Sequence, residues 1–337
     1  MKNKKKKPLL WVRLDNAAKI YPAARRRNWS NVYRQSVTLH EEVDAVVLKS
    51  ALRVVVKRFP TIAARLRKGL FWYYLQQVPS TPDIKEEYSY PITYMSKEEA
   101  RKCAFRVIAY KNRIAVEFFH ALTDGNGALV FLKNLVAEYL EQRHGIAIPF
   151  ENGIVDRKEP PKKEELVDDF PKYAGKVLAS RKDTNAWHMY GTTTKNGYLH
   201  ATCFKLPVKE ALDFAHRYKV TLTTFISAVM MLALYNLQHE KNPNVKKQKL
   251  IKLLIPINLR QLYPSKTLRN FAMYTIPEID PRLGEYTLEE ICKIVHHKMG
   301  LEFTAKHMSR VIATNVHDEQ NPLVRLIPLP LKLLKIY

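Results

Sequence analysis

The residues of this chain best suited to catalysis lie at the end of an apolar run, in the segment Arg113-Ile-Ala-Val-Glu-Phe-Phe-His120-Ala-Leu-Thr-Asp124-Gly125. Apolar residues before His120 favour a buried strand, and a polar turn follows at once. Imidazole titrates near neutral pH, so a histidine held at the rim of a sheet is suited to act as a general base. His120 is therefore the candidate base. A packed histidine at a strand end is the alternative that this pattern leaves open.

Asp124 precedes a stretch, Ala128–Leu140, that repeats apolar residues at helical spacing. Its carboxylate is placed to accept backbone N–H groups as an N-cap. We interpret Asp124 as structural, because it can shape the loop without touching the proton that moves.

The elements around this motif are a hairpin and a returning helix. Strands over 105–110 and 113–119 are predicted to turn at Lys111-Asn112, and the helix over 128–140 then closes a first α/β unit. Upstream, the patterns predict a short strand or entry loop over 11–20, a strand over 32–39, a helix over 41–59 stopped by Pro60, and a strand over 71–77.

Residues 149–171 are rich in Pro, Lys, Glu and Asp, which is typical of a connector. We predict a first unit over 1–148, a connector over 149–197 and a second unit over 198–337. The second unit is expected to contain strands over 198–206 and 250–257 and helices over 208–218, 221–238 and 287–302. Hairpins without strict βαβ alternation favour the α+β class.

The second unit has few predicted strands for its helices, and the chain ends in an apolar stretch, Leu333-Leu-Lys-Ile-Tyr337. Natural ends are usually polar. We therefore expect the second unit to be truncated at its C-terminus and this form of the chain to be poorly active.

The composition is that of a folded globular protein of 337 residues, with 46% hydrophobic and 26% charged residues. Three widely spaced cysteines give neither a disulfide framework nor a metal site, and a reducing cytoplasm fits best. No signal peptide or membrane-spanning run is found. The net charge of +24 favours anionic partners, but the basic clusters are short and lack a nucleic-acid motif.

The segment Phe118-Phe-His-Ala-Leu-Thr-Asp-Gly125 resembles the His-His-x-x-x-Asp-Gly signature of the CoA-dependent acyltransferase superfamily. That superfamily includes chloramphenicol acetyltransferase and the condensation domains of peptide synthetases, and the strongest likeness is to bacterial alcohol acetyltransferases. Segments 11–22, 69–75 and 255–260 with 268–271 are also similar. The resemblance implies two chloramphenicol-acetyltransferase-like sandwich subdomains with a tunnel between them.

The resemblance also implies roles for single residues. His120 matches the general base, Gly125 the signature glycine, and Asp124 the aspartate that pairs with an arginine of the second half, for which Arg260 is the best match. Asn270 matches the asparagine of a second-half loop, and either it or a backbone N–H is expected to bind the oxyanion. The implied co-substrate is acyl-CoA, with acetyl-CoA preferred, and the acceptor is a small alcohol or amine. Neither a permanently bound cofactor nor a metal is expected.

One departure from the signature leaves the function open. Phe119 stands where many members have the first histidine, although that histidine is not the base. The first hypothesis is an acyl-CoA-dependent O-acyltransferase; the others are a catalytically weak relative that serves as a binding module and a polybasic protein that docks on an anionic surface. His296-His297, the one His-His pair, lacks the rest of the signature and is interpreted as a polar helix face.

Overall fold

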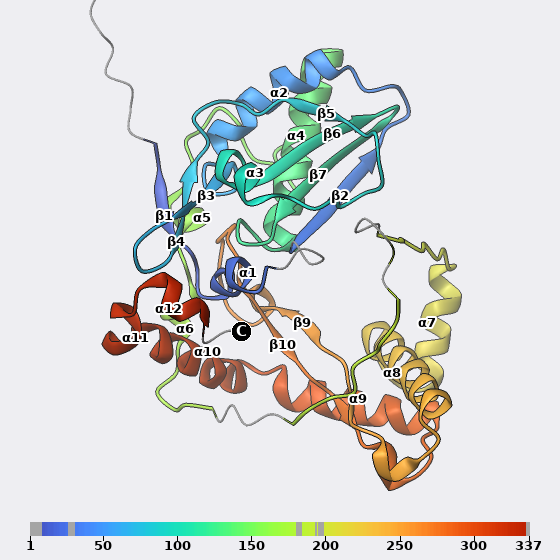
Figure 1. Ribbon diagram of the computed structural model, residues 1–337. Helices are drawn as coiled ribbons and strands as arrows, with labels where there is room; N and C mark the ends of the chain where they lie inside the picture. Colours follow the sequence, from blue (N-terminus) through green and yellow to red (C-terminus); the bar gives the residue numbers. More distant parts are fainter. Residues whose placement is uncertain (1–8, 26–30, 180–183, 193, 195–198, 335–337) are drawn as a thin grey trace, which may run out of the picture.

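The computed structural model describes residues 9–25, 31–179, 184–192, 194 and 199–334. Strands and helices alternate irregularly, and two sheet-containing regions meet near the loops that carry the candidate site (Figure 1). The predicted α+β class is confirmed.

The larger sheet has the strand order β2-β7-β6-β5, in which β2, β7 and β6 are antiparallel and β5 is parallel to β6. Its strands are β2 (Val32–Thr38), β5 (Ile84–Glu86), β6 (Phe105–Tyr110) and β7 (Arg113–Phe119). Helices α2 (Ala45–Arg58) and α4 (Gly125–His144) pack together behind this sheet (Figure 1). The predicted β6–β7 hairpin is confirmed, with Lys111 in the left-handed region at its turn.

A smaller antiparallel sheet, β1-β4-β3, lies beside the first. Its strands are β1 (Trp11–Arg13), β3 (Ala64–Lys68) and β4 (Tyr73–Gln77), and the short helices of this region are α1 (Ile20–Ala23) and α3 (Lys97–Lys102). The two sheets, α2 and α4 share one hydrophobic core. Leu268 of the second half also belongs to that core, so the two halves are packed together there.

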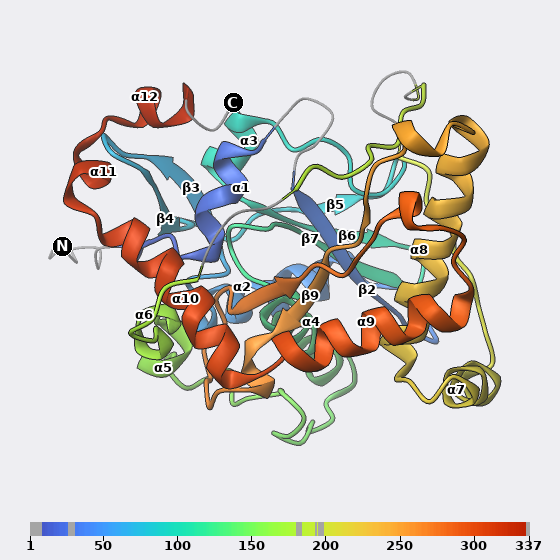
Figure 2. The same ribbon diagram turned by 90° about the horizontal axis from the view of Figure 1, so that it is seen from below.

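The second half consists of long helices against short β-ladders. Strand β9 (Ile255–Asn258) pairs with β10 (Ala272–Thr275), and β8 (Ile251–Lys252) with β11 (Glu278–Ile279). The helices are α7 (Val208–Arg217), α8 (Leu222–Lys241), α9 (Leu288–Glu302), α10 (Ala305–Gln320), α11 (Pro322–Leu326) and α12 (Leu329–Leu334). Helices α9 and α10 run along the β9–β10 ladder (Figure 2).

Of the strands predicted for the second half, one is wrong over all its described residues and the other is wrong in part. Tyr198 lies outside the described residues, and residues 199–206 are exposed and form no strand. The strand expected over 250–257 is broken at Leu253-Leu254, because β8 and β9 pair with different partners. Helix α10, capped by the Thr304 side chain, was not predicted.

The segment 149–171 contains structure that its composition did not predict. Helices α5 (Lys163–Leu166) and α6 (Phe170–Tyr173) lie in or at the end of it. Glu165 accepts two hydrogen bonds from the buried Arg58, at 2.6 and 2.7 Å. Phe170 is fully buried in the core formed with β9, β10 and α10. This segment is therefore anchored to both halves, and the boundaries 148/149 and 197/198 remain predictions.

Within the described residues, no single helix is long and apolar enough to cross a membrane. Only α7 and α8 taken together satisfy length and composition, and they are bent by 78°.

Candidate active site

His120 directly follows β7 and is held there by its backbone and its ring. Its backbone N–H donates to the carbonyl oxygen of Asn31 at 2.9 Å. The Tyr21 ring stacks on the imidazole, with centroids 4.2 Å apart and planes 14° apart, and the Tyr33 ring lies tilted at 4.7 Å. The two aromatic contacts fix the plane of the imidazole.

The two nitrogens of the His120 imidazole differ in their surroundings. Nδ1 lies 3.2 Å from Oδ1 of Asn270, whereas among the described residues Nε2 has no hydrogen-bond partner. Burial lowers the pKa of His120, and the hydrogen bonds and the negative charge of Asp124 offset this only in part. A neutral imidazole with one unoccupied nitrogen can accept a proton.

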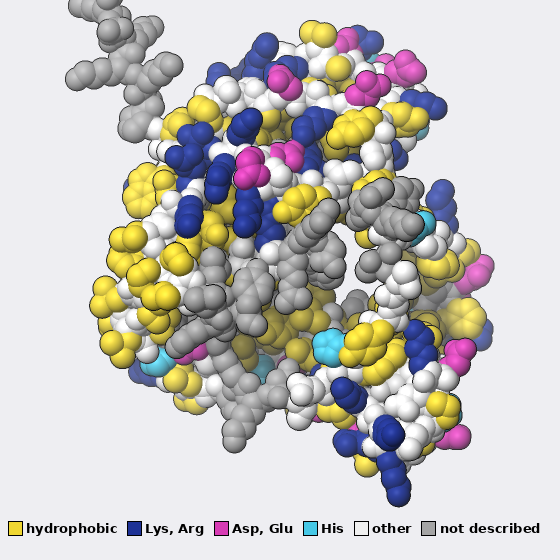
Figure 3. All heavy atoms as spheres, viewed as in Figure 1, with side chains coloured by type: hydrophobic (Ala, Val, Ile, Leu, Met, Phe, Trp, Pro, Cys, Tyr) yellow, Lys and Arg dark blue, Asp and Glu magenta, His cyan; other side chains and the backbone are white. Residues whose placement is uncertain are grey.

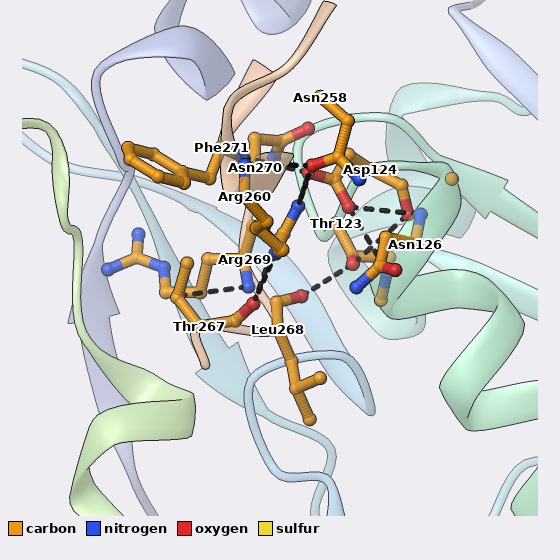
Figure 4. Close-up of polar contacts among 12 residues, drawn as sticks. Thr123, Asp124, Asn126, Asn258, Arg260, Thr267, Leu268, Arg269, Asn270 and Phe271 are labelled. Atoms are coloured by element: carbon orange, nitrogen blue, oxygen red, sulfur yellow. Dashed lines mark hydrogen bonds and ion pairs between the residues drawn. The ribbon is translucent and has the colours of Figure 1, made fainter. Parts of the chain in front are cut away.

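Asp124 uses its two carboxylate oxygens for different tasks (Figure 4). Oδ1 accepts the backbone N–H groups of Asn126 and Gly127, each at 3.1 Å, and so caps the N-terminus of α4. Oδ2 accepts from Nη1 of Arg260 at 2.7 Å and from the backbone N–H of Phe271 at 2.9 Å. The N-cap and the partner of a second-half arginine are therefore the same side chain.

Arg260 is placed by the loop it helps to fold. It lies in a short 3₁₀ turn after β9, and its guanidinium donates to the carbonyl oxygens of Thr267 and Arg269 at 2.7 Å each. These bonds curl residues 267–271 around the guanidinium (Figure 4). We call residues 267–271 the clasp loop.

The clasp loop and the start of α4 approach closely. Thr123 Oγ1 donates to the carbonyl oxygen of Leu268 at 2.6 Å. A Cβ atom added to Gly127 would lie 2.1 Å from Thr123 Oγ1 and 2.3 Å from Leu268 O, so only glycine fits there. A Cβ on Gly125 would meet nothing nearer than 3.9 Å. The steric requirement therefore falls on Gly127, and Gly125 instead offers its carbonyl oxygen to Gln35.

The structure brings four of the predicted site residues into one cluster: His120, Asp124, Arg260 and Asn270. His296 and His297 lie exposed on α9. Sequence reasoning missed several residues that hold the cluster, and these are Asp15, Tyr21, Tyr33, Thr123, Gly127 and Arg269. The polar pair Asp15-Asn16, directly after an apolar strand, was the one available signal for Asp15.

Other groups that could do chemistry are unsuited or lie elsewhere. Burial raises the pKa of the Cys103 thiol to about 12, which keeps it protonated and poorly nucleophilic. Within the described residues no group of His, Cys, Asp and Glu is arranged to hold a metal. Lys and Arg side chains gather over β3, β4 and α3 (Figure 3), where Arg67, Lys68 and Arg101 line a surface depression.

Comparison with known proteins identifies the class. A family model described as "Alcohol acetyltransferase" matches residues 170–276, a range that includes Arg260 and Asn270 but not His120. No curated protein matches the chain in sequence.

Three solved structures share the fold at low sequence identity. TRI101 of F. graminearum, solved with coenzyme A and deoxynivalenol, is 11% identical with a TM-score of 0.60, over 92% of this chain and 79% of that one. Polyketide synthase associated protein 5 of Mycobacterium tuberculosis is 13% identical with a TM-score of 0.56, over 90% and 76%. The first condensation domain of the calcium-dependent antibiotic synthetase is 12% identical with a TM-score of 0.54, over 88% and 76%.

The chain therefore has the fold of the chloramphenicol acetyltransferase-like acyltransferases and condensation domains. Residues 170–276 are similar to the alcohol acetyltransferase family model. The resemblance found in the sequence is confirmed at this level.

Proposed function

We propose that the protein transfers an acyl group, preferably acetyl, from a CoA thioester to the hydroxyl of a small alcohol, with His120 as general base. The observation that carries this proposal is the imidazole itself, which is fixed in its plane and bonded at Nδ1 while Nε2 has no partner among the described residues; burial also lowers its pKa. The alcohol acetyltransferase match supports the reaction class, and the CoA in TRI101 supports the co-substrate.

In the proposed reaction, Nε2 of His120 takes the hydroxyl proton as the alcohol oxygen attacks the thioester carbonyl carbon. The tetrahedral intermediate then collapses, the C–S bond breaks, and the imidazolium returns the proton to the departing thiolate. No acyl-enzyme forms, which agrees with the raised pKa of Cys103. The Asn270 amide already bonds Asp15 and His120, so we expect a backbone N–H to be the main oxyanion donor.

A thiol-release assay tests the reaction class. The full chain is incubated with acetyl-CoA and a panel of short alcohols and amines, and free CoA and the acetylated product are measured by absorbance and mass spectrometry. We expect release of CoA that depends on the acceptor and equals the ester formed. CoA binding without turnover would favour the binding module, and binding to anionic vesicles without CoA binding would favour the polybasic protein. Either of these results contradicts the transferase.

The location in the cytoplasm remains a proposal that rests on the composition of the chain. Fractionation of cells that carry a tagged full-length protein would test it.

A further inference from the structure

Asp15 is a buried carboxylate that the proposed reaction does not use. It lies two residues after β1 and is fully shielded from solvent. Its Oδ1 accepts the backbone N–H of Ala18 at 2.7 Å. Its Oδ2 accepts both the backbone N–H and the side-chain Nδ2 of Asn270, each at 3.3 Å. Burial of a carboxylate costs free energy unless its oxygens accept hydrogen bonds or face a positive charge. The hydrogen bonds of Asp15 therefore indicate what this residue contributes to the site.

The charge on Asp15 is compensated locally. Burial raises the pKa of Asp15, and the Arg269 guanidinium, with Nε 3.6 Å from Oδ2, opposes this together with the three N–H donors. Asp168 is a second carboxylate of this region, and its pKa is raised to about 6 by burial and by the charge of Asp15. Asp168 makes no bond to Asn270; it accepts instead from the backbone N–H groups of Asn16 and Phe170.

Asp15 determines which way the Asn270 amide faces. Asp15 Oδ2 already accepts the backbone N–H of Asn270 and faces Arg269 Nε, so it is an acceptor here and the amide nitrogen, not the amide oxygen, points to it. The amide oxygen is then left on the side of His120, 3.2 Å from Nδ1. A carbonyl oxygen can only accept, so Nδ1 must carry the proton.

The orientation of this amide thus favours one tautomer of the imidazole, alongside the interaction of the ring with the backbone of His120 itself. With the proton on Nδ1, the lone pair lies on Nε2, the nitrogen that has no partner among the described residues. If the amide were reversed, its Nδ2 would donate to Nδ1, the imidazole proton would lie on Nε2, and the exposed nitrogen could not take a proton. The stacked Tyr21 ring keeps the imidazole in the plane where this bond forms.

We infer that Asp15 is a positioning residue for His120: by orienting the Asn270 amide it holds the proton on Nδ1 and leaves the lone pair of Nε2 directed at the acceptor hydroxyl. This role deepens the proposed function and, for its effect on turnover, rests on it. The Asp15–Asn270–His120 series joins the N-terminal strand, the clasp loop and the end of β7. In this series the group that contacts the imidazole is a neutral amide. A carboxylate in the same place would raise the pKa of His120.

The test measures the tautomer directly and needs no substrate. The ¹⁵N chemical shifts of the neutral imidazoles are recorded at pH 8 on labelled full-length protein, and the His120 signals are assigned by their loss in His120→Gln. We expect wild-type His120 to be protonated at Nδ1. In folded Asp15→Leu and Asn270→Leu variants we expect a mixture of tautomers, a kcat for acyl transfer about tenfold or more lower, and an unchanged KM for acetyl-CoA.

Asp15→Asn serves as the conservative variant and Asp168→Asn as the matched control. An asparagine at 15 can still offer an oxygen to Asn270 Nδ2, so Asp15→Asn should restore much of the Nδ1 tautomer that Asp15→Leu loses. Asp168→Asn removes a neighbouring carboxylate that does not contact Asn270, and it should change neither the tautomer nor kcat.

The measurements distinguish a failure of the positioning role of Asp15 from a failure of the proposed function. A wild-type His120 protonated at Nε2, or an unchanged Nδ1 tautomer in both leucine variants, overturns the role of Asp15. If the tautomers change as expected but no protein form turns over acyl-CoA, the positioning role stands and the proposed function fails. If the leucine variants do not fold, Asp15→Asn decides: a partial loss of the Nδ1 tautomer that Asp168→Asn does not show supports the role, and an unchanged tautomer in Asp15→Asn or an Nε2 tautomer in wild type overturns it.

Discussion

The two loops that form the candidate site are fixed in different ways. The loop after β7 is fixed within the first half: a strand ends at Phe119, Asp124 caps α4, and Tyr33 of the adjacent strand β2 donates to two of the loop's carbonyl oxygens. The clasp loop, by contrast, is held to the first half by residues 145 to 256 positions away in the sequence. One loop follows from its neighbours, and the other depends on the docking of the two halves.

This difference predicts where substitutions should lower the stability of the molecule most. Local contacts survive a change at one position because the strand and the helix remain. The clasp loop has a few buried polar contacts with precise partners, so the loss of one leaves another unsatisfied. We therefore expect changes that break a contact between the two loops to cost more than changes of similar size that leave these contacts intact.

The largest effect is expected at the Asp124–Arg260 pair, whose side chains are 8% and 10% exposed. Asp124→Asn keeps a side-chain oxygen that can cap α4, so the stability lost in this variant should reflect the contacts made by Oδ2. Removal of one partner of a buried pair costs about 3–5 kcal/mol. Asp124→Asn and Arg260→Met should each lower the free energy of unfolding in urea by that order, and the double variant should lose much less than the sum.

An exposed pair provides the control for this cycle. Glu289 and Lys293 form an i, i+4 pair on α9 at 2.7 Å with both side chains largely exposed. Glu289→Gln should leave stability nearly unchanged, because solvent screens such pairs. Additive losses in the Asp124–Arg260 cycle would contradict the coupling of the two halves through this bond.

The next effect compares two glycines of one helix. Gly127→Ala forces a methyl group against Thr123 and the carbonyl of Leu268, and overpacking of this kind costs about 1–3 kcal/mol or more. Gly125→Ala meets open space at a position with ordinary backbone angles and should be neutral or slightly stabilising. Thermal unfolding of the two variants checks this. Equal melting temperatures would show that the clasp loop does not pack closely against α4 at Gly127.

The elements and residues that could be predicted from the sequence are those fixed by local contacts, and the ones that could not are fixed by distant contacts. The β6–β7 hairpin and the helices after residues 44, 124, 207, 221 and 287 have clear periodicity, and all of these helices except the one after residue 207 have side-chain caps, so they could be predicted. The strands β3, β5, β10 and β11 are short and take their structure from their partners, so they were not. His120 was found from its local pattern, whereas Arg260 and Asn270 were proposed by family resemblance alone, because no local signal links them to it. Gly127, Asp15 and Arg269 act through distant contacts that the sequence does not encode locally.

A smaller loss is expected when one hydrogen bond between the loops is removed. Thr123→Val keeps the shape of the side chain but leaves the buried carbonyl oxygen of Leu268 without its 2.6 Å donor. An unsatisfied buried acceptor costs about 1–3 kcal/mol. Thr123→Ser keeps the hydroxyl and should lose clearly less in chemical denaturation, so equal losses in the two variants would assign the effect to the methyl group instead.

The smallest effect concerns pH. Burial lowers the pKa of His120 below the ordinary value of 6.5, against the opposing effects of Asn270 and Asp124; the Tyr21 and Tyr33 rings complete its surroundings. A lowered pKa keeps the base neutral, and therefore competent, at lower pH than a free imidazole. The acidic limb of kcat/KM for acyl transfer should have its midpoint below 6.5. A midpoint above 6.5 would mean that a different group is the base.

The most direct test of the account is the rate of CoA release from acetyl-CoA and an accepted alcohol, compared for wild type and His120→Ala. His297→Ala, a change on the exposed side of α9, is the matched control. General-base catalysis contributes about 10²–10⁴-fold. We predict that folded His120→Ala loses activity by that factor while His297→Ala keeps it; near wild-type turnover in His120→Ala would contradict the account.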